Sequence, residues 1–199
     1  MLMYPSESRE VHGEIVLVRH GQTAWSARGR HTGSTDIALN DAGRRNGERL
    51  RARFAVMPYD GVYSSPLVRA RETAVLAGLY GAIIVDDLRE WDYGEYEGLT
   101  TAQILALRPG WDLFIDGCPG GDSPRDMDER ADRVLSAVTP DDEQGARIVL
   151  VAHGHFLRVF AARWLGFDAY FARYLHLDTA SVSVLSTEHQ THVIRSWNT

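Results

Sequence analysis

Short runs of aliphatic residues alternate along the chain with longer stretches in which apolar residues recur every three or four positions. The runs are rich in Val and Ile and are bounded by polar or glycine residues, which is typical of buried strands. The longer stretches have the period of amphipathic helices. The pattern predicts strands at 15–18, 62–64, 83–85 and 147–152, and helices at 40–55, 67–79, 100–107, 123–138 and 154–166.

Residues with known positional preferences support several of these helix boundaries. Asn40 precedes the first helix and is a favourable N-cap, whereas Pro66 and Pro124 stand where proline suits a first turn. Gly81 follows the second helix as a stop signal. The segments 23–36, 86–98 and 110–124 lack a clear period, and we expect loops or turns there.

Strands that alternate with helices are typical of a parallel sheet covered on both faces. We therefore expect a single three-layer α/β/α domain over 14–199 with a mostly parallel central sheet. Two final strands at 181–185 and 192–196 would close the sheet as a hairpin. Residues 1–13 are polar and read as an N-terminal lead-in, and no stretch resembles a linker or an internal repeat.

Composition excludes several classes of protein. The net charge of −6 argues against a general nucleic-acid binder. All 21 basic residues are arginine, so a Schiff-base or P-loop lysine mechanism is excluded. Cys118 is the single cysteine, which rules out an intrachain disulfide, and we expect it to be an unreactive loop residue. No apolar run is long enough to span a bilayer and no signal-peptide pattern is present, so we expect a cytoplasmic protein without membrane contact.

Two predicted strands end in the same way, with histidine beside glycine. Arg19-His20-Gly21 follows the first strand, and His153-Gly154-His155 follows the strand at 147–152. The carboxyl ends of parallel strands face one edge of the sheet, where ligands bind. We therefore expect both histidines at a common crevice, with the following helix N-termini favouring an anion.

Further charged residues follow the other two parallel strands. Arg69 lies in the first turns of the helix after the second strand, where it could hold phosphate oxygens together with Arg19. The third strand leads to the acidic and aromatic segment 88–98. A carboxylic acid among aromatic residues can act as a proton donor. Composition does not choose among its four acids, which are Glu90, Asp92, Glu95 and Glu97.

In this order, these motifs resemble those of the histidine phosphatase superfamily, the phosphoglycerate-mutase-like proteins with an Arg-His-Gly motif. The resemblance covers about residues 14–187 and includes Arg19-His20-Gly21-Gln22-Thr23, the segment 65–73, Leu88-x-Glu90 through Gly98, and Ala152-His153-Gly154. It implies that His20 is the nucleophile and becomes a phosphohistidine. It also implies that Glu90 is the general acid and base, and that Arg19, Arg69 and His153 form the phosphate pocket.

The resemblance implies further contacts to substrate. It adds Gln22, Thr23, Ser26 and Gly154 as substrate-binding residues and Arg30, His31, Arg89 and His155 as candidates for contacts to the far end of the substrate. Ser26 stands where many relatives carry asparagine, Asn46 replaces a common glutamine, and Gly121-Asp122-Ser123 replaces Gly-Glu-Ser. Loop details look similar to the branch with sedoheptulose-bisphosphatase-like and actinobacterial phosphatases.

These observations favour a metal-independent phosphatase for small phosphorylated metabolites such as sugar phosphates, with no cofactor and no metal. The main alternative is a cofactor-dependent phosphoglycerate mutase, which is disfavoured because segments that cap the mutase site are absent. A non-catalytic phosphate-binding protein and a His153-x-His155 metal site are the remaining alternatives. The sequence is compatible with a homodimer.

Overall fold

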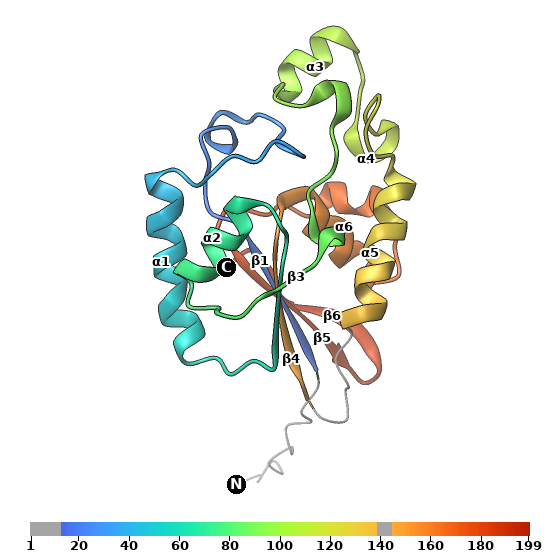
Figure 1. The fold of residues 1–199 in the computed structure, drawn as a ribbon. Coiled ribbons are helices and arrows are strands. Elements are labelled where there is room, and N and C mark those ends of the chain that lie inside the picture. Colours follow the sequence, from blue (N-terminus) through green and yellow to red (C-terminus); the bar gives the residue numbers. More distant parts are fainter. Residues whose placement is uncertain (1–12, 139–144) are drawn as a thin grey trace, which may run out of the picture.

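The computed structural model describes residues 13–138 and 145–199 (Figure 1). The lead-in expected over 1–13 therefore lies outside the described residues, apart from Gly13. The described chain forms three layers, with a central sheet between two groups of helices (Figure 1). This confirms the predicted three-layer α/β/α architecture.

The sheet has six strands in the order β3-β2-β4-β1-β5-β6. Their bounds are β1 Glu14–Arg19, β2 Gly61–Ser64, β3 Ile83–Ile84, β4 Arg147–Ala152, β5 Val182–Glu188 and β6 Thr191–Ser196. The first four strands are mutually parallel, whereas β5 runs antiparallel to both β1 and β6. The sheet is thus mostly parallel, and the predicted closing hairpin is confirmed.

The α-helices cover both faces of this sheet. Their bounds are α1 Asp41–Ala55, α2 Val68–Leu76, α3 Thr101–Leu107, α4 Leu113–Asp116, α5 Pro124–Val138 and α6 Gly154–Trp164. The described residues also form four 3₁₀ helices, which are η1 Ser26–Arg28, η2 Asp86–Leu88, η3 Gly94–Tyr96 and η4 Ala169–Tyr174. Helices α1 and α2 lie on one side of the sheet and α5 and α6 on the other, while α3 and α4 stand beyond one end (Figure 1).

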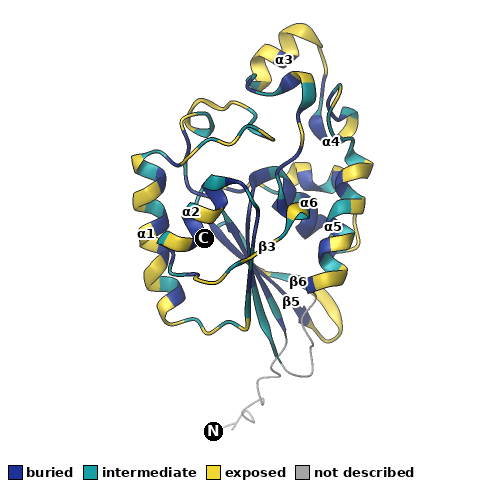
Figure 2. Ribbon diagram, viewed as in Figure 1, coloured by how far each residue is buried: buried dark blue, intermediate teal, exposed yellow. Residues whose placement is uncertain are grey.

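Alternation along the central strands divides the apolar side chains between two cores. On β1, Ile15 and Leu17 pack into the core beneath α5 and α6, whereas Val16 and Val18 pack into the core beneath α1 and α2. Figure 2 shows the central strands as buried and the outer helix faces as exposed. Strands with apolar residues on both faces must be covered on both sides, which explains the third layer.

Three predicted elements differ from the structure. Helix α2 ends at Leu76 rather than near residue 79 because Gly78, at φ 80°, turns the chain in a left-handed conformation. The segment 110–124, predicted as a loop, contains the short helix α4, which is capped by the Asp112 carboxylate. Strand β3 has only two residues, both exposed at the edge of the sheet.

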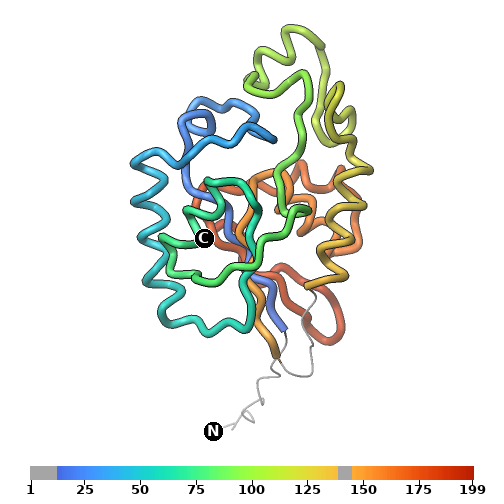
Figure 3. The backbone as a smooth tube through the Cα atoms, in the orientation of Figure 1, coloured from blue at the N-terminus to red at the C-terminus, as the bar shows by residue number. Residues whose placement is uncertain are grey.

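Two segments that are distant in sequence meet beyond the carboxyl ends of the parallel strands. Arg30 forms an antiparallel bridge with Thr100, and the backbone of His31 exchanges hydrogen bonds with Gly98 and Leu99. Figure 3 shows the two segments in blue and green above the sheet. They form walls above the edge at which the strand-end histidines were expected.

Candidate active site

The register of β1 and β4 places His20 beside His153. Arg19 pairs with Ala152 at the strand ends, and the His20 N–H donates to the Ala152 carbonyl at 2.9 Å. The two imidazole centroids are 5.1 Å apart. The histidines are 133 positions apart in sequence, and the parallel pairing brings them together as predicted from the two strand endings.

The His20 ring is buried and held in one orientation. Its Nδ1 lies 2.7 Å from the carbonyl oxygen of Gly21. Burial lowers the pKa of His20 well below its ordinary value, and the charges of Arg19 and Arg69 lower that pKa further. A neutral ring whose Nδ1 faces a carbonyl carries its proton on Nδ1, so the lone pair is on Nε2.

Arg19 supplies an unsatisfied cation next to this ring. One terminal nitrogen donates to the carbonyl of Leu177, whereas Nε is buried and has no hydrogen-bond partner in the described part of the chain. A Cβ on Gly154 would lie 3.1 Å from both Nε and Cζ of Arg19, so the glycine leaves room for the guanidinium. A buried donor without a partner is costly, and an anionic ligand would satisfy it.

The Arg69 side chain is fully buried, and most of its hydrogen bonds go to the loop above it. Its terminal nitrogens donate to the carbonyls of Thr32, Gly33 and Thr35, each at 3.0 Å. Its Nε donates to Nδ1 of His153 at 3.2 Å. Arg69 therefore anchors the 32–35 loop and orients His153, which leaves it fewer free N–H groups than Arg19 has.

Both nitrogens of His153 have protein partners. Nδ1 accepts from Arg69, so the neutral ring carries its proton on Nε2, which donates to Ser65 Oγ at 2.8 Å. Burial lowers the His153 pKa well below its ordinary value. The described residues contain no group of three or more His, Cys, Asp or Glu side chains that could hold a metal ion, and His153 and His155 do not share a partner.

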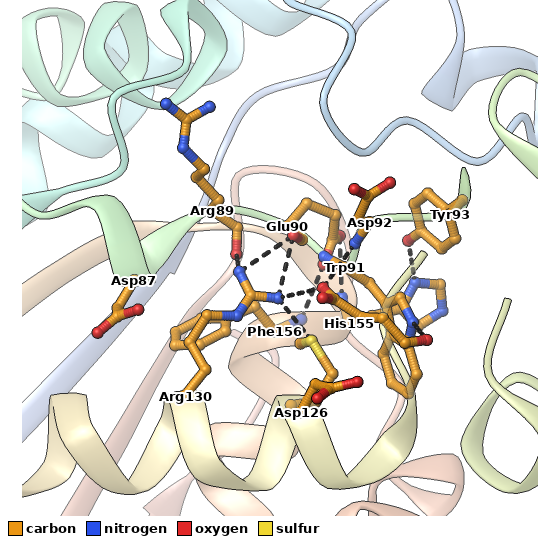
Figure 4. A network of polar contacts seen from close by, with 12 residues as sticks. Asp87, Arg89, Glu90, Trp91, Asp92, Tyr93, Asp126, Arg130, His155 and Phe156 are labelled. Carbon is orange, nitrogen blue, oxygen red and sulfur yellow. Dashed lines mark hydrogen bonds and ion pairs between the residues drawn. The ribbon is translucent and has the colours of Figure 1, made fainter. Parts of the chain in front are cut away.

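The Glu90 carboxylate lies at the N-terminus of α6. Oε1 accepts from the backbone N–H groups of Trp91 and Phe156, each at 2.9 Å, and Oε2 accepts from the N–H of His155 at 3.1 Å. Helix N-termini favour negative charge, so the start of α6 holds this carboxylate in place. Figure 4 shows these contacts.

A cavity of about 240 Å³ opens over these groups. Eight of the sequence-predicted site residues line it, namely Arg19, His20, Ser26, Arg30, His31, Glu90, Gly154 and His155. Arg69 and His153 are not part of this lining; Arg69 contacts His153, and the ring of His153 contacts that of His20. The Ser26 hydroxyl is hydrogen-bonded to the backbone of Thr23, which orders the η1 turn at the rim.

Three predicted substrate contacts lie away from the cavity. The Gln22 amide oxygen accepts from Asn40, and the fully buried Thr23 hydroxyl accepts from the N–H of Ser26. The Arg89 side chain pairs with Asp86 at 2.6 Å and points away from Glu90 (Figure 4). Arg89 follows η2 directly, and its guanidinium turns back to that helix and does not line the cavity, so its contact to the far end of the substrate stays a prediction.

A group of aromatic and cationic side chains, here called the far wall, lines the cavity around His155. The Tyr93 hydroxyl lies 2.5 Å from Nδ1 of His155, and the ring of His31 lies 4.7 Å from that of Tyr93. Burial lowers the His31 pKa to about 4 and lowers the Arg158 pKa to about 10. At neutral pH this wall therefore offers neutral imidazoles, a phenol and one buried positive charge.

Reasoning from the sequence missed several residues of this site. Tyr93, Thr101 and Arg158 line the cavity, and Ser65 holds His153. Arg158 could have been found because it lies three positions after His155 on a helix that starts at the site. Cys118 is buried and its pKa is raised by burial to about 12, in agreement with an unreactive thiol.

Residues 15–199 match the model of the histidine phosphatase superfamily, branch 1, so the chain belongs to that family. It is similar to an acid phosphatase of Mycobacterium tuberculosis, at 38% identity over 88% of this chain and 87% of the relative. It is also similar to the sedoheptulose 1,7-bisphosphatase of Saccharomyces cerevisiae, at 33% identity over 76% of this chain and 67% of that protein.

Solved structures agree with these sequence matches. A protein of Mycobacterium tuberculosis superposes with a TM-score of 0.89 and 36% identity, covering 94% of this chain and 97% of the other. A mycobacterial glucosyl-3-phosphoglycerate phosphatase superposes with a TM-score of 0.82 and 27% identity, covering 94% and 98%. No helix among the described residues is long and apolar enough to cross a bilayer.

Proposed function

We propose that this protein is a phosphatase that hydrolyses phosphomonoesters of small metabolites, sugar phosphates or related compounds, through a phosphohistidine on His20. The observation that carries the proposal is the hydrogen bond from His20 Nδ1 to the Gly21 carbonyl in a site that keeps the ring neutral. A neutral imidazole with its lone pair on Nε2 is a ready nucleophile at neutral pH. The chemistry needs no metal to activate it.

In the first half-reaction, His20 Nε2 attacks phosphorus in line with the leaving oxygen. The N–P bond forms as the P–O bond to the alcohol breaks, and the charge of the phosphoryl oxygens is stabilised by Arg19. Glu90 Oε1 accepts two N–H groups but Oε2 only one, so Oε2 retains an open position for a proton. That proton passes to the leaving alkoxide and completes the alcohol.

In the second half-reaction, the Glu90 carboxylate takes a proton from water as the water oxygen attacks phosphorus. The N–P bond breaks, inorganic phosphate leaves, and His20 returns to the neutral form. Each half-reaction thus uses the same carboxyl group, first as acid and then as base. The N–H groups of His155 and Phe156 at the N-terminus of α6 hold that group beside the cavity.

The far wall supports a polar metabolite as the alcohol portion. His31, Tyr93 and His155 are neutral groups that can hydrogen-bond hydroxyls, and Arg30 and Arg158 add positive charge. The acid phosphatase, the sedoheptulose bisphosphatase and the glucosyl-3-phosphoglycerate phosphatase among the relatives are named for hydrolysis of this kind. We infer that a phosphorylated sugar or sugar-derived acid is the substrate.

The test is hydrolysis of p-nitrophenyl phosphate with EDTA present, followed by a panel of sugar phosphates. The wild type and His20→Ala are compared with His189→Asn, a change to an exposed histidine in the β5–β6 turn. We expect activity in the wild type and in the control and none in His20→Ala. Interconversion of phosphoglycerates that depends on 2,3-bisphosphoglycerate, with little net release of phosphate, would instead identify a mutase.

A further inference from the structure

We propose that Arg130 of α5 is a positioning residue for Glu90 and sets its efficiency as the proton donor. This inference rests on the proposed function. Arg130 comes from a helix outside the cavity and does not line it. Its guanidinium lies beneath the segment that carries Glu90 and contacts three neighbouring parts of the chain (Figure 4).

The first contacts are to the backbone of the Glu90 segment itself. One terminal nitrogen of Arg130 donates to the carbonyl of Arg89 at 2.8 Å and to that of Glu90 at 3.2 Å. The other terminal nitrogen also donates to the Glu90 carbonyl at 3.2 Å. The carbonyls on both sides of the Glu90 Cα atom are therefore held by one rigid guanidinium group.

The second contact ties the same guanidinium to the loop before α5. Arg130 forms an ion pair with Asp122 at 2.9 Å. Further hydrogen bonds of Asp122 return to the Glu90 segment, because its carboxylate accepts from the N–H of Asp92 and its carbonyl accepts from the Trp91 indole. Residues 89–92 are thus linked to Arg130 directly and through Asp122.

The third contact reaches the other side of the Glu90 carboxylate. The Arg130 guanidinium lies over the ring of Phe156, 5.3 Å from its centre, and the N–H of Phe156 donates to Glu90 Oε1. Arg130 thereby contacts both the backbone of Glu90 and Phe156, the residue whose N–H binds the Glu90 carboxylate. The Arg130 side chain is only 12% exposed, so water cannot easily replace these contacts.

The nucleophile is held by different elements. Arg19 is the last residue of β1 and His20 follows it, and their hydrogen bonds go to Gly21, Ala152, Leu177, Ala180 and Ser181. Loss of Arg130 should therefore displace the proton donor and leave the phosphate pocket in place. Proton donation matters most for a basic alkoxide leaving group and least for an acidic phenol.

The experiment compares 2,4-dinitrophenyl phosphate, which has an acidic leaving group, with glucose 6-phosphate, which has a basic one. The variants are Arg130→Leu and Arg130→Lys, with Glu90→Gln as reference and Arg125→Leu as the matched control. Arg125 lies on the same helix and forms an ion pair with Glu129 at the exposed surface. Inhibition by orthophosphate reports on the phosphate pocket in each variant.

For Arg130→Leu we expect kcat/KM, which reports the first half-reaction, to fall at least about tenfold with glucose 6-phosphate and to change less than about threefold with the dinitrophenyl ester. Glu90→Gln should show the same contrast, Arg130→Lys a partial one, and orthophosphate inhibition should stay unchanged. An equal loss with both esters, or no loss with either, would overturn the positioning role. If Arg130→Leu does not fold, the contrast in Arg130→Lys decides. A wild type inactive on both esters would overturn the proposed function and this inference with it.

Discussion

His20 Nδ1 lies 2.7 Å from the carbonyl oxygen of Gly21, the next residue in the chain. This short contact decides which nitrogen of the nucleophile is free. Because the ring is kept neutral by burial and by Arg19 and Arg69, its single proton occupies Nδ1 and its lone pair occupies Nε2. The backbone after β1 thus fixes the reactive tautomer of the His20 imidazole before any substrate binds.

The first prediction concerns the position of the phosphoryl group. Rapid acid-free quenching during turnover should trap phosphate on Nε2 of His20, as determined by NMR of the isolated phosphopeptide. His20→Ala should lower kcat by at least about a thousandfold, since removal of a nucleophile eliminates the covalent route. Phosphate on Nδ1, or on another residue, would contradict the assignment.

The second prediction concerns the acidic side of the pH–rate profile. The pKa of His20 is lowered, so the ring stays neutral and nucleophilic as pH falls through about 6.5, the ordinary histidine value. We therefore expect that the profile of kcat/KM against pH shows no fall that follows an enzyme group with a pKa near 6.5. The profile is measured with two esters whose phosphate groups differ in pKa. An inflection that moves with the ester belongs to the substrate, and one that stays in place belongs to the enzyme. An inflection near 6.5 with both esters would show that His20 titrates normally.

The third prediction concerns the space that Gly154 leaves for Arg19. In Gly154→Ala the new Cβ would lie 3.1 Å from the Arg19 guanidinium, which must shift by a few tenths of an ångström. We expect kcat/KM to fall about tenfold through this misplacement, with little change in thermal stability. Inhibition by orthophosphate should weaken in parallel. Unchanged inhibition would show that Arg19 does not hold the phosphate.

The fourth prediction concerns the close approach of α1 to the segment after His20. A Cβ on Gly43 would lie 2.1 Å from the Gln22 carbonyl oxygen and 2.7 Å from the Gln22 nitrogen. Both are backbone atoms, so Gly43→Ala should lower the free energy of unfolding by about 3 kcal/mol. Urea unfolding measures this, with Arg45→Ala, an exposed change on the same helix, as control. Equal stability of the two variants would contradict the close contact between Gly43 and the backbone of Gln22.

The fifth prediction concerns stability in acid. His20, His153 and His155 have pKa values well below the ordinary one, and that of His31 is about 4. These groups stay neutral in the folded protein, whereas in the unfolded chain they bind protons below about pH 6.5. The unfolded state thus gains protons first, and stability should fall between about pH 6.5 and 4.

Urea midpoints at several pH values across that window measure this fall. His31→Gln should make the midpoint less dependent on pH than it is in the wild type, because one depressed pKa is removed. Exposed His189→Asn serves as the matched control and should leave the dependence unchanged. A midpoint that rises on acidification would show that these histidines are protonated in the folded state.

Most of the fold could be predicted because local signals and tertiary packing agree. The runs at 15–18 and 147–152 form the central pair β1 and β4, and Asn40 caps α1 by accepting from Gly43. The errors occur where local signals are weak. Helix α4 has only four residues, too few for an apolar period, and β3 is a two-residue edge strand whose side chains are exposed.

The sequence by itself determined which residues lie at the strand ends, because alternating strands and helices place the carboxyl ends of parallel strands at one edge. That was sufficient to bring His20 and His153 to one crevice, with Arg69 beside them. It did not determine where long side chains point. Arg69 turns to the carbonyls of the 32–35 loop and Arg89 to Asp86. Arg158, which also lines the cavity, turns to the carbonyls of Ala172 and Arg173.

Only the tertiary structure decided these directions, since each depends on which carbonyl or carboxylate a distant segment presents. The same holds for Arg130, which lies 40 positions after Glu90 yet holds its backbone. Periodicity reports which face of a helix is buried, but a buried arginine on that face is placed by its hydrogen-bond partners. Those partners come from other parts of the chain, and their positions exist only once the layers have packed.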